Sequence, residues 1–402
     1  MLASFAAAPS PASESPARAS TLTILSDLDG TLLPRPYPTA SGTVAHPNLS
    51  EGPCFRPLVR LLDLGCTIVG VTGSRLVTHK HRFFDELPLV HRKAGKVLMA
   101  VQTGTCLYRG SREDGSPVED EAFTSYLSSK VASSIPLDAI DILIESGRAG
   151  IRRFFADLRE DPSLVDANGP LSYLLQCDAE SVPVTQDDQQ VPRIEVRDGN
   201  SAVVFVGVPS SINHQYFSVD PRVADVVDGR PTGRACFDCV PKGLDKSLVV
   251  EHLIETGVVS GGGSSCGRYT PSSGDLGGAR GDGGRALALG DQPLGNDEGL
   301  TRWHRGGEGG GGAGAGEVVD IPFVSVSEAE RMVPPHLREA HITSACNAEA
   351  SARLLNAIAD MIEAHQGGAG GEGKQQAWDA QPPPLRLDTE AVVALTRRLN
   401  GR

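Results

Sequence analysis

Several features are scarce or missing in this sequence, and each absence excludes a class of protein. No run of about 18 or more apolar residues occurs in the 402-residue chain, so no membrane-spanning helix is expected. Basic residues are outnumbered, because 37 Lys and Arg stand against 50 Asp and Glu. The resulting formal net charge of −13 disfavours nucleic acid as a partner. An acidic protein can still bind a small anion where positive groups gather locally.

Cysteine is too sparse for a disulfide framework. The eight cysteines are scattered through a long chain and no secretory signal is obvious, so reduced thiols are expected. Cys236 and Cys239 form a lone C-x-x-C motif. A zinc site would need a second such pair or nearby histidines, and no second pair is present. Redox chemistry favours a motif at the start of a helix, whereas this motif precedes a proline turn inside a predicted strand. Similarly, we expect His79-Lys80-His81 to be surface charge rather than a metal site.

Two carboxylates, Asp27 and Asp29, stand just beyond the apolar run 22–25. This run is short enough to be a buried strand. Open α/β sheets hold their ligands beyond the carboxyl ends of their strands, which is where both carboxylates are expected.

Three further segments follow in an order that suits one chemistry. Thr72, Gly73, Ser74 and Arg75 follow the apolar run 67–71, and their hydroxyl and amide groups at a strand-to-helix turn can cradle an anion. Lys246 begins a predicted helix over 245–255, after a turn marked by proline and glycine. Beyond the apolar run 286–289, the last segment adds Asp291, Asn296 and Asp297.

Together the four segments supply the groups that phosphoryl transfer requires. A carboxylate nucleophile divides the reaction into two steps through an aspartyl-phosphate. A divalent cation held by carboxylates offsets charge, while hydroxyl, amide and ammonium donors stabilise the phosphate oxygens. A second acid protonates the leaving oxygen and then activates water.

These motifs resemble the haloacid dehalogenase (HAD) superfamily, and in particular its Cof-type and sucrose-phosphate-phosphatase-like branch. The resemblance implies a magnesium-dependent phosphatase that acts on a small phosphorylated metabolite such as a sugar phosphate. It further implies a role for each motif residue. Asp27 would be the nucleophile and Asp29 the general acid/base, while Thr72 and Gly73 would bind the phosphate. Lys246, rather than Lys242, would contact the phosphate and Asp27; the Mg²⁺ site would consist of Asp27, the backbone carbonyl of Asp29 and Asp291, with Asn296 and Asp297 as supporting residues.

One motif departs from the common pattern of these relatives. Four residues, 292–295, separate Asp291 from Asn296, where many members have two. The eukaryotic phosphomannomutases of the same superfamily have a lengthened loop at this point. The alternatives are therefore a phosphomutase of that type, or a non-catalytic protein that binds a sugar phosphate.

The insertion between the second and third motifs predicts a cap. Only 42 residues separate Asp29 from Thr72, whereas 170 separate Arg75 from Lys246, enough for a small second domain. Residues 139–158 read as a mainly helical segment, weak at Ser146-Gly147, and 171–177, 194–196 and 202–208 read as strands. Among the cap arginines, Arg193, Arg197 and Arg222 could clamp a second anionic group, although solvated surface is the more usual role and the one expected.

We therefore predict an α/β protein with a three-layer, Rossmann-like parallel-sheet core and an inserted α+β cap. Helices are also expected at 55–64, 349–365 and 388–399, and a last core strand at 321–326. The predicted location is the cytoplasm, or an organelle if residues 1–20 are a transit peptide. The predicted division is a disordered or targeting tail at 1–20, core at 21–108, cap at 109–235, core again at 236–365 with glycine-rich loops 260–284 and 305–316, and a linker with a C-terminal helix at 366–402.

Overall fold

A computed structural model describes residues 22–35, 37–38, 44–187, 190–259, 285–304, 321–328, 330, 333–367 and 387–401. The predicted tail 1–20 and both glycine-rich loops lie outside these residues. So does the predicted linker, apart from its first two residues, which belong to the helix before it. None of the described helices is both long and apolar enough to cross a membrane.

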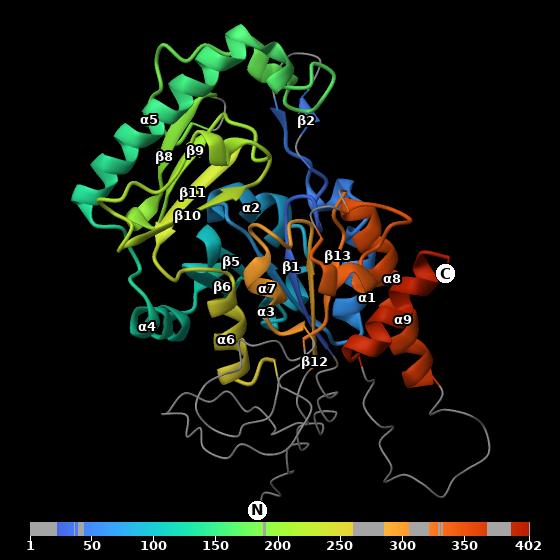
Figure 1. Cartoon of the computed structure of the whole chain (residues 1–402). Helices are drawn as coiled ribbons and strands as arrows, with labels where there is room; N and C mark the ends of the chain where they lie inside the picture. Colours follow the sequence, from blue (N-terminus) through green and yellow to red (C-terminus); the bar gives the residue numbers. More distant parts are fainter. Residues whose placement is uncertain are drawn as a thin grey trace, which may run out of the picture.

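The described residues form a seven-stranded core sheet in the order β13-β12-β1-β4-β5-β6-β7 (Figure 1). The first five strands run parallel, and β6 and β7 extend the edge antiparallel to their neighbours. The strands are β1 (Leu22–Asp27), β4 (Thr67–Val71), β5 (Val97–Val101), β6 (Cys106–Gly110), β7 (Pro117–Glu119), β12 (Arg285–Gly290) and β13 (Phe323–Ser325). This arrangement confirms the predicted α/β core.

Helices cover both faces of this sheet because the strands are apolar on both sides. In β1, Leu22 and Ile24 join an apolar cluster with α1 and α8, whereas Leu25 joins a second cluster with α4 and α6. The core helices are α1 (Phe55–Asp63), α2 (Leu76–His79), α3 (Leu89–Lys93), α4 (Glu121–Lys130), α6 (Ser247–Glu255), α7 (Glu298–Thr301), α8 (Asn347–Gly367) and α9 (Thr389–Leu399). A three-layer core results, as predicted.

The cap is a second, antiparallel sheet in the order β10-β11-β9-β8, with α5 along its outer face (Figure 1). Successive side chains of β9 point to opposite faces of the cap sheet. Val203 and Phe205 pack toward α5, whereas Val204 and Val206 face the core. The cap elements are α5 (Leu137–Glu160), β8 (Arg193–Val196), β9 (Val203–Val206), β10 (Val227–Thr232) and β11 (Cys236–Pro241).

Short segments complete the described fold. A two-stranded hairpin joins β2 (Tyr37–Pro38) to β3 (Val44–Ala45), and a π-helical turn, η2 (Lys80–Phe84), continues α2. The 3₁₀ turns are η1 (Leu49–Glu51), η3 (Gln102–Gly104), η4 (Pro162–Leu164), η5 (Ser172–Gln176), η6 (Asp198–Asn200), η7 (Asn213–Gln215) and η11 (Pro335–Ala340).

The division between core and cap differs from the predicted 109–235. Strand β7 and helix α4 belong to the core, because β7 pairs with β6 and Phe123 of α4 joins the core cluster. At the other boundary, β11 belongs to the cap sheet, where it pairs with β9 and β10. The cap cluster runs from Ile135 to Cys239, so both boundaries lie later in the chain than predicted.

One predicted cap strand is wrong. Residues 171–177 form the 3₁₀ turn η5 instead, and only Leu174 of that turn is fully buried. A short apolar run by itself does not separate a strand from a buried turn. The predicted strands at 194–196 and 202–208 correspond to β8 and β9, and the predicted helices correspond to α1, α5, α6, α8 and α9.

Gly147 tests how closely α5 packs against the cap sheet. A Cβ atom at this position would lie 2.6 Å from ring carbons of Phe205, so the apparent weak point in the helix is a packing requirement. Overpacking costs about 1–3 kcal/mol, and alanine recovers about 1 kcal/mol of helix propensity. We predict that Gly147→Ala lowers the free energy of unfolding by about 1 kcal/mol in thermal denaturation. Half-buried Ser146 is the control: Ser146→Ala should be neutral or slightly stabilising, and an equal loss in both variants would contradict the packing argument.

Candidate functional site

The carboxyl edge of the core sheet brings the predicted segments together. Asp27 is the last residue of β1, where it pairs in parallel register with Val71, the residue before Thr72. On the other side of β1, Ser26 pairs with Leu289, two residues before Asp291. Because these strands are parallel neighbours, their ends and the polar residues that follow meet at one place.

Lys246 links two of these segments. This fully buried residue is at the N-terminal end of α6, and its Nζ donates to Asp27 Oδ1 at 2.5 Å and to Asp297 Oδ1 at 2.8 Å. Lys242 Nζ instead donates to the backbone carbonyl oxygen of Ala224 at 2.9 Å, in an exposed hydrogen bond. The structure therefore places Lys246, and not Lys242, beside Asp27.

Crowded carboxylates dominate the electrostatics. Burial, followed by repulsion from Asp297, raises the pKa of Asp27 well above its ordinary value despite the attraction of Lys246. Burial and the same neighbour raise the pKa of Asp291 to about 6, although Arg35 opposes this rise. Burial opposes the charged form of Lys246, but Asp27 and Asp297 outweigh it and raise the pKa of that ammonium. The cluster therefore favours an additional positive charge.

A metal ion fits this donor set. Asp27, Asp291 and Asp297 are buried, and each offers a carboxylate oxygen within 4.8 Å of the others, which suits hard cations. Gly30 keeps the space beside them open, because a Cβ atom there would lie 2.5 Å from Asp291 Oδ2. The Asp29 carboxylate is not part of this group. The predicted ligand from that residue is its backbone carbonyl, which stays a prediction.

The lengthened loop 292–295 is accommodated as a turn. The amides of Gly295 and Asp297 donate to the Gln292 carbonyl, which returns the chain toward β12. Asp297 then accepts from the Gln292 amide at 2.9 Å while its other oxygen binds Lys246. At the end of β12, Gly290 leaves room for it, since a Cβ atom there would lie 2.5 Å from Asp297 Oδ2. The turn at 292–295 thus places Asp297 within hydrogen-bond distance of Lys246.

Polar atoms surround Gly73 in the second motif. Buried Thr72 accepts from the Ser74 amide at 3.1 Å, and Thr103, Asn296 and Asp238 each bring a polar atom within 3.7 Å of where a Gly73 Cβ would lie. Thr103 Oγ1 and Asn296 Oδ1 are buried and have no hydrogen-bond partner among the described residues. Unpaired buried polar groups are rare, so a polar ligand at this place is physically reasonable.

Asp29 points away from the carboxylate cluster. His79 Nε2 lies 2.8 Å from Asp29 Oδ2, and Arg82 Nη2 donates to Oδ1 at 3.1 Å. Burial would raise the pKa of Asp29, but His79 and Arg82 outweigh it and hold that pKa below its ordinary range. The π-helical turn η2 follows α2 directly, so that both side chains reach the same carboxylate.

His79 corrects an expectation from the sequence. The segment 79–81 was expected to be surface charge, yet the His79 side chain is fully buried, whereas that of His81 is 75% exposed. Sequence reasoning missed His79 and Arg82 as neighbours of Asp29. Their i, i+3 spacing just after the second motif is the available signal, because such a pair shares one face of a helix.

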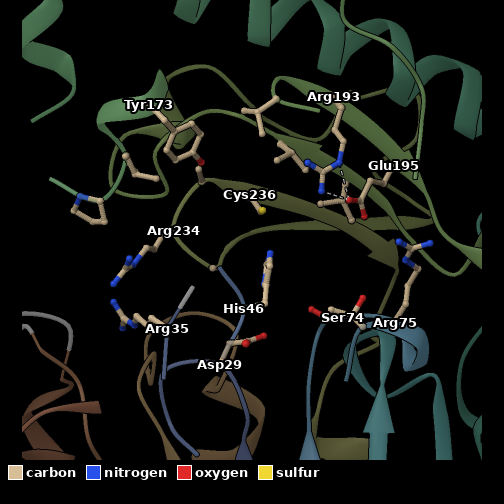
Figure 2. A pocket seen from close by; sticks show the side chains of 18 of the residues that line it. Asp29, Arg35, His46, Ser74, Arg75, Tyr173, Arg193, Glu195, Arg234 and Cys236 are labelled. Carbon is tan, nitrogen blue, oxygen red and sulfur yellow. Dashed lines mark hydrogen bonds and ion pairs between the residues drawn. The ribbon is translucent and has the colours of Figure 1, made fainter. Parts of the chain in front are cut away.

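A cavity of about 290 Å³ lies between core and cap, above Asp29 and Ser74 (Figure 2). Its lining includes six arginines, none of them among the predicted catalytic, phosphate or metal residues. Arg193 and Arg197 are buried in this lining rather than solvated, which corrects the expectation for these two. Arg222 is exposed and pairs with Asp220, as expected of a surface residue. The arginines are Arg35, Arg75, Arg82, Arg193, Arg197 and Arg234.

Within the part of the chain that the structure describes, no cysteine forms a disulfide. Burial, followed by repulsion from Asp238, raises the pKa of Cys236 to about 12 and raises that of Cys239 as well. Both thiols lie on β11 and stay protonated near neutral pH, which disfavours metal ligation and redox exchange.

Comparison with known proteins gives structural likenesses only. No protein-family model matches the sequence, and no curated protein sequence does. Similar solved structures include the trehalose-6-phosphate phosphatase of Aspergillus fumigatus (12% identity, TM-score 0.40, 85% of this chain and 94% of that chain). Another is the sucrose-phosphatase of Synechocystis sp., in complex with sucrose and phosphate (14%, 0.41, 85% and 98%). A third is a phosphatase of the haloalkanoate (HAD) enzyme superfamily from Bacteroides thetaiotaomicron (12%, 0.42, 88% and 99%). At such low identities and TM-scores, an activity has to be inferred from the geometry of the site itself.

The acidic cluster predicts stabilisation by divalent cations. A ligand that binds only the folded state at a hundred times its dissociation constant stabilises by about 2.7 kcal/mol. We expect magnesium or manganese chloride to raise the thermal unfolding midpoint, and Asp291→Asn to lose most of this increase. Asp360→Asn, which removes an exposed carboxylate of α8, should keep it. Equal responses of the two variants would show that the cation binds elsewhere.

Proposed function

We infer that this protein is a magnesium-dependent phosphomonoester hydrolase that acts on a small phosphorylated metabolite through an aspartyl-phosphate. The observation that carries this inference is the convergence of Asp27, Lys246, Asp291 and Asp297 in one buried cluster, next to the end of the strand that Thr72 follows. A structural ion pair would need only one carboxylate for Lys246. Three carboxylates at the end of parallel strands, next to unpaired polar groups, are instead suited to a cation and a phosphate.

In the first step, Asp27 is the proposed nucleophile. A carboxylate oxygen attacks phosphorus, the bond from phosphorus to the ester oxygen breaks, and the leaving oxygen takes a proton. Among the described residues, no hydrogen bond is donated to Asp27 Oδ2, while Lys246 orients the carboxylate through Oδ1. Lys246, Thr72 and the Gly73 amide are the proposed donors to the phosphate oxygens. A magnesium ion held by Asp27 and Asp291 would neutralise charge on the phosphoryl group.

In the second step, water attacks phosphorus of the aspartyl-phosphate, the bond to Asp27 breaks, and inorganic phosphate leaves. Asp29 is the proposed base for this water. Although burial opposes them, His79 and Arg82 lower its pKa, which keeps the group ionised at neutral pH but also makes it a weaker base. Its role as acid in the first step needs a proton. The His79 ring, 2.8 Å from Asp29 Oδ2, is the adjacent group that can share one.

The proposal is tested at the nucleophile. Asp27→Asn keeps the size of the side chain but removes the attacking carboxylate, so phosphate release in the presence of magnesium should fall by roughly 10³-fold or more. Circular dichroism and thermal denaturation should show a folded protein. Near-normal release from a folded Asp27→Asn variant would remove Asp27 as nucleophile.

Leaving groups distinguish the proposed role of Asp29. Glycerol phosphate releases a strongly basic alkoxide that needs a proton, whereas para-nitrophenyl phosphate releases a stable phenolate. If Asp29 donates that proton, Asp29→Asn should lower kcat on glycerol phosphate by about 10²- to 10⁴-fold and lower it far less on the nitrophenyl ester. Equal losses on the two substrates would assign Asp29 to positioning alone.

The same assay on a sugar bisphosphate would reveal a mutase, because isomers would then appear in place of free phosphate.

A further inference from the structure

In the loop 72–74, which follows β4 and is proposed to bind phosphate, three consecutive carbonyl oxygens accept hydrogen bonds from outside the loop. The first accepts from the Thr103 amide at 3.0 Å, and the third accepts from the Gln102 amide at 2.8 Å. The second, between them, accepts from the side chain of Arg197. The orientation of each of these peptides is therefore fixed by a donor that lies elsewhere in the chain.

The peptide between Gly73 and Ser74 connects Arg197 to the hydroxyl of Thr72. In a planar trans peptide the carbonyl and the following N–H point in opposite directions, so a donor that fixes the Gly73 carbonyl also directs the Ser74 amide. That amide donates to Thr72 Oγ1 at 3.1 Å. A hydroxyl oxygen that accepts such a bond can still donate its own proton. The contact of Arg197 therefore acts, through one peptide, on the direction in which Thr72 can donate.

Two of the three donors belong to the core and one belongs to the cap. Gln102 and Thr103 lie in the core turn η3, with φ values of 52° and 62°. Such a conformation is uncommon for residues other than glycine, and it recurs at binding and active sites because the surrounding structure has to hold it. Arg197 instead follows strand β8 of the cap directly. The core alone thus supports the outer two carbonyls of the loop, and the cap supports the middle one.

Contacts on the cap side hold Arg197 in place. Its side chain is buried, and its Nε lies 3.7 Å from Glu195 Oε2. Arg193 donates to the other oxygen of the same carboxylate, Oε1, at 2.9 Å, and Figure 2 shows this pair on the cap wall of the cavity. Hydrogen bonds from a charged donor are roughly twice as strong as neutral ones. Arg197 is therefore suited to hold a backbone carbonyl firmly.

We propose that Arg197 is a positioning residue, whose hydrogen bond to the Gly73 carbonyl orients the Thr72 hydroxyl for donation to the phosphoryl group. This inference rests on the proposed function, since it concerns how the same site binds phosphate. Because the donor comes from the cap, the affinity of the core for phosphate depends on the cap being seated on it.

Inorganic phosphate is the probe for this role, because it tests the loop without a leaving group. Its dissociation constant can be obtained from the rise in the thermal unfolding midpoint in magnesium buffer. Arg197→Met keeps the length of the side chain and removes its donors, while Glu195 keeps Arg193 as a partner. The dissociation constant should rise about tenfold. Arg222→Gln, which alters an exposed cap arginine outside the cavity lining, is the matched control and should leave it unchanged.

A purely structural role predicts a different result. Arg197→Met would then lower the unfolding midpoint equally with and without phosphate, and the dissociation constant would not move. That outcome would overturn the proposal. Arg197→Lys keeps a charged donor and should recover part of the lost affinity, and no recovery would count against the hydrogen bond to Gly73.

A double-mutant cycle separates positioning from direct contact with phosphate. Thr72→Val removes the hydroxyl through which Arg197 is proposed to act. In a Thr72→Val protein, Arg197→Met should therefore weaken phosphate binding by less than about twofold, which is the usual margin of additivity. Losses that multiply would show that Arg197 binds phosphate independently of Thr72, and the positioning role would be refuted.

Esters with different leaving groups locate the effect within the substrate. The phosphoryl group is common to para-nitrophenyl phosphate and glycerol phosphate, so Arg197→Met should lower kcat/KM on both by the same factor, about tenfold. Arg197 also lines the cavity, where a leaving group would lie. Losses that differ between the two esters would assign it to the leaving group and contradict the proposal.

Binding and turnover together separate this inference from the proposed function. If the wild type releases no phosphate from either ester, but phosphate affinity depends on Arg197 through Thr72, the proposed hydrolysis fails and the positioning role stands. If both esters are hydrolysed and Arg197→Met changes neither affinity nor rate, the positioning role fails and hydrolysis stands.

Discussion

One buried ammonium holds the site together. Lys246 joins Asp27 at the end of β1 to Asp297 beyond β12, and it does so with no exposure to water. A buried lysine is tolerable only beside compensating carboxylates, and two buried carboxylates are tolerable only beside a cation. The positions of these three segments therefore depend on one another. The third carboxylate, Asp291, is what makes the cluster more than a structural ion pair, since its charge is left to Arg35 or to a metal ion.

The core and the cap contribute different groups to the carboxylate cluster and to the cavity beside it. The core supplies the carboxylates, the hydroxyl of Thr72 and the open space at Gly30 and Gly290, where side chains would collide with Asp291 and Asp297. The cap contributes an apolar wall and three of the six arginines that line the cavity, Arg193, Arg197 and Arg234. The contact of Arg197 with the Gly73 carbonyl connects the two, because it ties a cap strand to the loop proposed to hold phosphate.

Much of the site could be predicted because its residues follow strands. Asp27, Thr72 and Asp291 come just after short apolar runs, and parallel strands place such residues at one edge. The inward direction of His79 could not be predicted, since it depends on the π-helical turn that continues α2. The contact of Arg197 with Gly73 depends on how the cap is seated, which no local pattern encodes. Likewise, residues 171–177 have an apolar pattern that fits a strand, a helix or the observed turn.

Strand β9 connects the wall of the cavity to the apolar core of the protein. Its inner residues, Val204 and Val206, line the cavity and also belong to the apolar cluster that contains Leu248 and Leu253 of α6. The wall of the cavity thus belongs to the same apolar cluster as α6, the helix that Lys246 precedes. Removal of the cap would therefore expose apolar surface of this cluster to water. A substitution at Val204 or Val206 would change the wall of the cavity and the packing of the core at the same time.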